Sequence, residues 1–250
     1  MGSSNNPLFS VITACRACLP FIGQCLRSVM AQRTSVPWEM IIVDDCSSDK
    51  TYKRAKEIAA SYNSKSKNNI IVLKNKNRMY CGPTYNYLLS LATGKYCGIL
   101  DGDDVLLPDA ISTIVKQYEA NPHVDFIWTR HNWGNTKLDK FRNGLSTFPK
   151  NGTIYDSEKG FRHIYSHWRT FKTEMRDRGT LFRDLKCTVD KDLGYNLEEL
   201  GQGAFLPISL YNYRYHLKNM SHSSNQKGKW KEVRQWHKNR PRPYRIIKLS

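Results

Sequence analysis

The sequence contains no long hydrophobic run. Among its 250 residues, no apolar stretch approaches the ~18 that a membrane-spanning helix requires. The N-terminus is rich in Gly, Ser and Asn and lacks the apolar core of a secretory signal peptide, so we expect residues 1–7 to form a flexible N-terminus. These absences favour a cytoplasmic protein and leave open a peripheral contact with a membrane.

Disulfide patterns and glycine-rich motifs are also missing. Seven cysteines are an odd number, and most lie in or beside apolar runs, which favours reduced, buried thiols. Cys15 and Cys18 form a Cys-x-x-Cys pair, but no second pair answers it, so a zinc site is not indicated. The chain has neither a G-x-G-x-x-G sequence after its first expected strand nor a P-loop. The sheet would therefore have to hold its ligand by carboxylates and a metal instead of a glycine-rich loop.

Acidic residues are few relative to basic ones. Lys and Arg number 39 against 22 Asp and Glu, which gives a net charge of +17. Residues 227–250 hold nine Lys or Arg and one Glu, and Pro241 and Pro243 argue against a continuous helix there. This basic C-terminal tail could be a solvated extension, or it could anchor the protein to an anionic membrane surface or a polyanionic acceptor. Nucleic acid is a less favoured partner because only the charge supports it.

Strand and helix patterns alternate along the first half of the chain. Buried apolar runs are followed by segments with apolar residues at helical spacing, which predicts an α/β fold with a largely parallel sheet and helices on both faces. We expect strands at residues 9–13, 38–43, 70–74, 96–100 and 124–128, and helices over 19–32, from Ser47–Asp49 to Tyr62, from Pro83 to Gly94, and along Ile111–Tyr118.

From residue 129 to 188 the pattern loosens, and aromatic and histidine side chains accompany many Arg and Lys. Such a mixture suits hydroxyl-rich or anionic ligands, although each ring could equally belong to the core. The side chains concerned are Trp128, Trp133, Trp168, His131, His163 and His167. Beyond this region we expect an amphipathic run over 193–200 and a strand over 204–211.

Two acidic clusters follow expected strands. Asp101-Gly102-Asp103-Asp104 comes after the run 96–100, and Asp44-Asp45 comes after the run 40–43. Either cluster alone could be an acidic surface turn, and EF-hand spacing is absent. In an open α/β sheet, however, ligands bind beyond the carboxyl ends of the strands, so the two clusters together predict one shared site for a divalent metal and a polar ligand.

These two acidic clusters and four further segments resemble motifs of family 2 glycosyltransferases with the GT-A fold. The four segments are Phe9-Ser10-Val11-Ile12-Thr13, Ser28-Val29-Met30-Ala31-Gln32, Val189-Asp190-Lys191-Asp192-Leu193 and Tyr213-Arg214-Tyr215-His216. The resemblance covers roughly residues 8–222. It implies a single catalytic domain, with a nucleotide-sugar-binding half over 8–128, an acceptor-binding half over 129–226, and the tail at 227–250.

The resemblance also implies roles for individual residues. Asp103, Asp101 and His216 would hold Mn²⁺ or Mg²⁺, and Asp190 would be the catalytic base that accepts the proton of the acceptor hydroxyl. Asp192 is the competitor for this role, and we prefer Asp190. The residues expected at the nucleotide-sugar are Thr13, Arg16, Asp44, Asp101, Gly102 and Arg214.

The predicted activity is metal-dependent, inverting transfer of a sugar from a nucleotide-sugar donor, with a UDP-sugar favoured, to a hydroxyl acceptor such as a glycan. One alternative is a non-catalytic sugar- or polyanion-binding module on a transferase fold. Another is a nucleotidyltransferase, which should have a basic, glycine-rich loop near the first strand. Residues 14–20 contain no such loop.

Overall fold

The computed structural model describes residues 6–158, 164–217, 219 and 229–250. The expectations for residues 1–5 of the flexible N-terminus, for His163, and for residues 227 and 228 of the tail lie outside this part of the chain.

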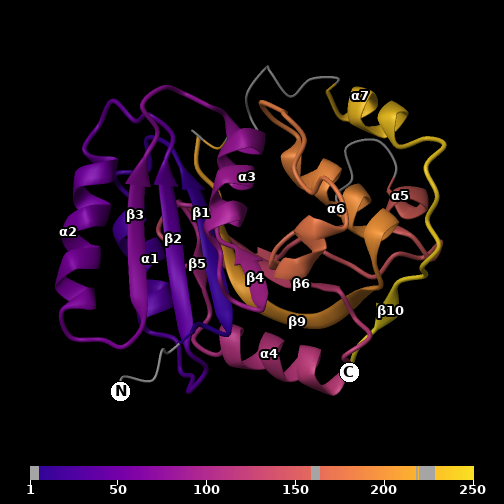
Figure 1. Ribbon diagram of the computed structural model, residues 1–250, viewed down its shortest axis with the longest axis horizontal. Coiled ribbons are helices and arrows are strands. Elements are labelled where there is room, and N and C mark those ends of the chain that lie inside the picture. Colours follow the sequence, from indigo (N-terminus) through magenta and orange to yellow (C-terminus); the bar gives the residue numbers. More distant parts are fainter. Residues whose placement is uncertain (1–5, 159–163, 218, 220–228) are drawn as a thin grey trace.

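One ten-stranded sheet organises the molecule, in the order β10-β9-β6-β8-β4-β1-β2-β3, with β5 paired to β9 and β7 to β6 (Figure 1). Its first half is parallel: β1 lies between β2 and β4, and β2 pairs with β3. The bounds are β1 Phe9–Cys15, β2 Trp38–Asp44, β3 Asn69–Lys74 and β4 Tyr96–Ile99. These strands match the expected ones closely, and the α/β, mostly parallel GT-A fold is confirmed.

Helices cover both faces of this half. One face carries α1 (Ile22–Met30), α2 (Thr51–Asn63) and α4 (Ala110–Ala120), which pack on alternate strand residues such as Val11 and Met40. The other face carries α3 (Cys81–Leu91), which packs on the intervening residues Ile12 and Ile41. Because both faces are covered, the strands read as continuous apolar runs and not as alternating ones.

The second half of the sheet contains the strands expected over 124–128 and 204–211, both extending further than predicted, and other strands that the sequence did not predict. β6 (Phe126–Gly134) and β9 (Gly203–Arg214) are parallel to each other, and β8 (Arg169–Lys172) lies antiparallel between β4 and β6. β8 therefore joins the two halves of the domain. The remaining elements are β5 Val105–Leu106, β7 Phe141–Asn143, α5 Ile154–Ser157, η1 Thr173–Asp177, α6 Val189–Leu200, α7 Lys229–Trp236 and β10 Ile247–Lys248.

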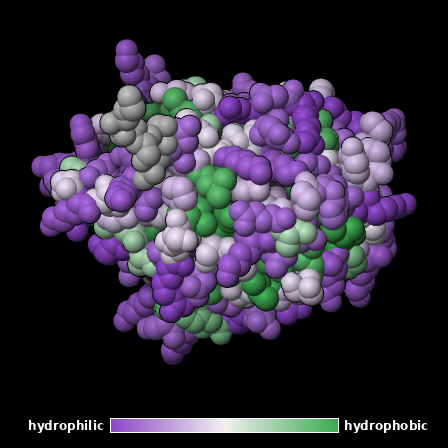
Figure 2. Space-filling model, turned by 60° about the horizontal axis from the view of Figure 1, so that its bottom comes forward, coloured by the Kyte–Doolittle hydropathy of each residue, from purple (hydrophilic) through white to green (hydrophobic). Residues whose placement is uncertain are grey.

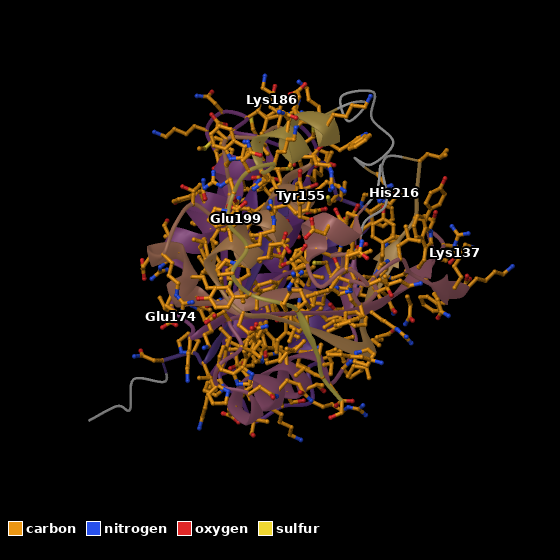
Figure 3. The ribbon with its side chains drawn as sticks, turned by 90° about the vertical axis from the view of Figure 1, so that its right-hand side faces the viewer. Lys137, Tyr155, Glu174, Lys186, Glu199 and His216 are labelled. Atoms are coloured by element: carbon orange, nitrogen blue, oxygen red, sulfur yellow. The ribbon has the colours of Figure 1, made fainter. Side chains whose placement is uncertain are left out.

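The described part of the basic tail packs against the domain. β10 pairs in parallel with β9, and Val233, His237 and Ile246 are buried. Figure 1 shows α7 near α5 and α6, and Figure 3 views the same side with Tyr155 and Glu199 labelled toward its centre. The guanidinium groups of Arg234 and Arg242 each lie 3.9 Å from the Tyr155 ring centroid. The tail from residue 229 onward is thus part of the fold.

The burial of the tryptophans and the character of the surface bear on two expectations from the sequence, the place of the aromatic rings and the absence of a membrane-spanning segment. Trp128 and Trp168 are fully buried, so they belong to the core, whereas Trp133 is partly exposed. The face in Figure 2 is mainly hydrophilic, with small, separate hydrophobic patches. Within the described ranges, no helix has both the length and the apolar character needed to cross a bilayer.

Candidate active site

The Asp101–Asp104 loop leaves the carboxyl end of β4 and passes over the end of β1. A Cβ atom on Gly102 would lie 2.6 Å from the Cβ of Cys15, so this close approach requires glycine. Tyr211 of β9 fixes the loop: its hydroxyl donates to Asp104 Oδ2 at 2.7 Å and accepts the Asp101 N–H at 3.2 Å. The loop is therefore held by a strand from the other half of the domain.

Asp101 is the most heavily bonded carboxylate of the loop. Its Oδ1 accepts the hydroxyl of Tyr85 at 2.8 Å, and its Oδ2 contacts His167 Nε2 at 3.1 Å and Arg169 Nη2 at 2.9 Å. Burial favours the neutral acid, but the charge of Arg169 and the bond to His167 outweigh it and hold the pKa of Asp101 well below its usual range. Asp101 is therefore ionised at neutral pH.

Asp103 faces the residues after β9. Its Oδ2 lies 2.9 Å from His216 Nε2 and 3.4 Å from Asn219 Nδ2. Figure 3 shows His216 on the same side of the molecule as Lys137. The structure therefore brings together Asp103 and His216, two of the three residues expected at the metal.

Asp104 is buried beneath the loop. Burial, reinforced by the neighbouring charges of Asp103 and Asp101, raises its pKa well above the usual range. Asp101, Asp104 and His167 each offer one ligand atom, and these three atoms lie within 4.8 Å of one another. Carboxylate oxygens and imidazole nitrogens suit Mn²⁺ and other divalent cations, so the donor set fits such an ion.

Arg214 is almost fully buried and bonded to protein groups. Its Nε donates to the Asp103 carbonyl at 2.6 Å, Nη1 to the Thr136 carbonyl at 2.5 Å, and Nη2 to Gln24 Oε1 at 2.6 Å. In this conformer Arg214 braces the loop backbone. The expected contact of Arg214 with the nucleotide-sugar stays a prediction.

Three of the residues expected at the nucleotide-sugar, Thr13, Arg16 and Asp44, lie at or near the ends of β1 and β2. Thr13 and Asp44 are fully buried on the same face of the sheet. Asp44 Oδ1 accepts the Ser47 N–H at 2.8 Å, whereas Asp44 Oδ2 and Thr13 Oγ1 have no hydrogen-bond partner in the described part of the chain. Buried polar atoms are rarely left unpaired, which makes these two oxygens candidates for contact with a ligand. Arg16 is exposed at the end of β1.

Asp45 has a different place from Asp44. Its carboxylate accepts the backbone N–H groups of Met79 and Tyr80 at 2.7 and 2.9 Å and the side-chain amide of Asn75 at 2.8 Å. It thus fixes the turn before α3, and its role is structural.

Asp190 and Asp192 lie on the first turn of α6 in contrasting surroundings. The Asp190 side chain is 48% exposed and forms an ion pair with Arg169. Asp192 is fully buried and bonded to Arg183, Asn196 and His237. Only Asp190 has the solvent access that an acceptor hydroxyl would need, which supports the preference for it as the base.

Sequence reasoning missed Arg169 and Tyr85, which shape this site, and it named His167 only within a group of rings that could bind a ligand or belong to the core. Burial disfavours the charged form of Arg169, but Asp190 and Asp101 hold its pKa above the ordinary value. The signal was present, because His167 and Arg169 interrupt an otherwise apolar and aromatic stretch. A cation in such a stretch indicates a buried ion pair.

A model of the family described as Glycosyl transferase family 2 matches residues 10–181. The chain belongs to this family. It is a glycosyltransferase with the GT-A fold.

Among the similar proteins is the putative glycosyltransferase EpsE of Bacillus subtilis (strain 168). It is 31% identical over 211 residues, which cover 78% of this chain and 72% of EpsE. The chondroitin synthase of Escherichia coli is 29% identical over 217 residues, which cover 86% of this chain but only 30% of that protein.

Solved structures that share the fold include two transferases in complex with nucleotide-sugars. TarS 1–349 from S. aureus, in complex with UDP-GlcNAc, has a TM-score of 0.74 at 18% identity, covering 92% of this chain and 65% of that one. The mannosyltransferase PcManGT from Pyrobaculum calidifontis, in complex with GDP-Man and Mn²⁺, has a TM-score of 0.64 at 17% identity, covering 93% and 62%. The chain thus spans less than two thirds of either protein.

Proposed function

We propose that the protein transfers a sugar from a UDP-sugar to a hydroxyl acceptor, with inversion at the anomeric carbon and with the help of Mn²⁺ or Mg²⁺. The observation that supports this proposal most strongly is that residues from the end of one strand, the start of another strand and the start of a helix lie in contact. The Asp101–Asp104 loop after β4, Arg169 of β8 and Asp190 of α6 are joined by direct ion pairs.

The nucleobase would be read by Asp44 and Thr13. Uracil presents an N–H between two carbonyl oxygens, and the unpaired Asp44 Oδ2 and Thr13 Oγ1 offer an acceptor and a hydroxyl donor. Both side chains are fully buried in this conformer. Binding would therefore require the neighbouring turn, where the Ala17 N–H donates to Ser47 Oγ at 2.9 Å, to open. The complex of TarS with UDP-GlcNAc supports the choice of uracil.

Asp103 and His216, whose ligand atoms lie 2.9 Å apart, would hold the metal, and Asp101 of the same loop is the third expected ligand. A divalent cation supplies Lewis-acid stabilisation of the charge that develops on the departing diphosphate. The chain's own contribution is to fix these ligands: Tyr211 and Arg214 hold the loop, and Tyr85 and His167 hold Asp101. The Mn²⁺ in the PcManGT complex supports a metal in this fold.

The base would be Asp190. For inversion in one displacement, the acceptor hydroxyl must attack from the side opposite the leaving group, and its proton must pass to a carboxylate within hydrogen-bond reach. Asp190 is partly exposed and approaches the site from α6, the opposite half of the domain from Asp44. A glycan would supply the acceptor hydroxyl.

A thermal-shift panel of UDP, GDP, CDP and dTDP, each with and without Mn²⁺, tests the donor class. We expect UDP with Mn²⁺ to raise the melting temperature most, because a ligand that binds only the folded state stabilises it by mass action. A larger shift with another nucleotide would reassign the base. Shifts with UDP but no sugar transfer to any tested acceptor would favour the non-catalytic binding module.

A further inference from the structure

Arg169 occupies an unusual position for a cation. It lies on β8, opposite Ile99 in the antiparallel register with β4, and its side chain is fully buried. Its Nη2 contacts Asp101 Oδ2 at 2.9 Å, and its Nη1 pairs with Asp190 Oδ1. One guanidinium therefore bridges a carboxylate of the donor loop and the predicted base.

This bridge is a poor device for stability alone. Burying a guanidinium is unfavourable unless its ion pairs offset the lost hydration, and well-packed apolar residues often stabilise a core equally well. Among the residues that the structure describes, the Nε of Arg169 has no hydrogen-bond partner, so its ion pairs offset the cost of burial only in part. One partner, Asp190, remains half exposed, so the pair extends from the core to the solvent side of the site.

We infer that Arg169 is a positioning residue that holds the Asp190 carboxylate at a fixed place relative to the Asp101–Asp104 loop. The inference rests on the proposed function. A planar guanidinium presents its N–H groups in a rigid fork, so two carboxylates that bind it are fixed relative to each other. In transfer chemistry a misplacement of about 1 Å costs ~10²-fold in rate, which makes such a bridge valuable.

Arg183 provides a matched comparison. It also pairs with an aspartate on the first turn of α6, but that aspartate is the buried Asp192, which has no access to the site. Loss of either arginine removes one ion pair to the same helix turn. Only the loss of Arg169 removes a contact with the predicted base.

The test compares Arg169→Met, Arg169→Lys and Arg183→Met with the parent protein in steady-state sugar transfer, UDP affinity and melting temperature. We expect Arg169→Met to lower kcat by ~10²-fold, with UDP affinity changed only a few-fold. Arg169→Lys keeps the charge but loses the fork, and it should fall between Met and the parent. Arg183→Met should lower the melting temperature and leave kcat nearly unchanged at a temperature where it is folded.

A double-mutant cycle separates positioning from a general structural effect. If Arg169 acts through Asp190, Arg169→Met should cause little further loss of rate in an Asp190→Asn background. An equal loss in both backgrounds, or a kcat of Arg169→Met within threefold of the parent, would overturn the inference. Should Arg169→Met fail to fold, unchanged kcat in Arg169→Lys would overturn it equally. A parent protein with no transfer activity would instead refute the proposed function.

Discussion

At the scale of single residues, we predict opposite effects for substitutions of Asp190 and Asp192, although the two residues are only two positions apart. The first should affect the transfer rate and the second the stability of the fold. Asp190→Asn should lower kcat by about 10²–10⁴-fold, the usual effect of losing a general base, with a smaller loss of melting temperature than Asp192→Asn because Arg169 keeps its ion pair with Asp101. Asp192→Asn should destabilise the fold by about 3 kcal/mol, because Arg183 and His237 would be left facing a neutral group. Transfer rates and thermal unfolding of both variants check this. A stable, inactive Asp192→Asn would shift the assignment of the base by two residues.

Asp44 and Asp45 form a second contrasting pair. Asp44→Ala should weaken UDP binding by about 1–3 kcal/mol, the scale of a hydrogen bond to a charged group, because it removes the unpaired Oδ2. Asp45→Ala should instead lower the melting temperature, since the N–H groups of Met79 and Tyr80 lose their acceptor. Calorimetric titration with UDP beside thermal unfolding distinguishes the two. Undiminished UDP affinity in Asp44→Ala would remove this residue from the base site.

The site residues that could be predicted from the sequence are those that lie in a recognisable local sequence pattern. Asp101, Asp103 and Asp104 follow a buried strand, so their strand-end position was predictable. Arg169 acts through Asp101 and Asp190, which lie 68 and 21 positions away in the chain by their numbering, and no local pattern encodes that meeting. Contacts set by tertiary structure were therefore the part of the site that sequence could not give.

At the scale of elements, the parallel half of the sheet was predictable and β8 was not. β1, β2 and β4 are apolar runs bounded by helices of regular period. β8 is a short strand containing an arginine and a lysine, and its place between β4 and β6 depends on long-range pairing. Its four residues give no helical or alternating pattern to detect.

The packing of the segment after α7 on α6 gives a pH-dependent prediction. His237 contacts Asp192 at 3.0 Å and Glu199 at 2.6 Å. Burial disfavours its charged form, but these two carboxylates outweigh burial and raise the pKa of His237 above 6.5. The stabilisation is therefore complete below pH 6.5 and is lost as the pH rises through the raised value.

His237→Gln should accordingly have its largest deficit in melting temperature below pH 6.5, and the deficit should shrink toward pH 9. The exposed His123 is the control, and His123→Gln should follow the parent protein at every pH. Melting curves across this range provide the measurement. A deficit that grows as the pH rises would show that His237 is held neutral in the folded protein.

At the scale of the whole molecule, the net charge of +17 divides into basic residues that are paired within the fold and basic residues that are exposed to solvent. Part of the tail's charge is paired within the fold, as in the contacts of Arg240 with Glu199 at 2.7 Å and of Arg242 with Glu198 at 3.0 Å. Deleting the tail would therefore remove core residues as well as charge. Exposed lysines of this segment, Lys231, Lys238 and Lys248, allow a cleaner test of membrane contact.

Replacing these three lysines by glutamine should weaken binding to phosphatidylserine vesicles at low salt, by about 1 kcal/mol for each charge near the surface. Lys53, Lys65 and Lys67, in and after α2 at the opposite end of the molecule, form the matched control set (Figure 1). Vesicle sedimentation at two salt concentrations would report the difference. Equal losses from both sets would indicate binding through overall charge and no anchoring surface.

The most direct test of the metal-dependent nucleotide-sugar site is calorimetric titration of UDP into the parent protein and Asp103→Asn, with and without Mn²⁺. Asparagine keeps the size of the side chain but removes the charge that a divalent cation requires. We predict that Mn²⁺ strengthens UDP binding to the parent and has no effect on the variant, while both proteins unfold at nearly the same temperature. Equal, Mn²⁺-dependent UDP binding by the two proteins would contradict the account.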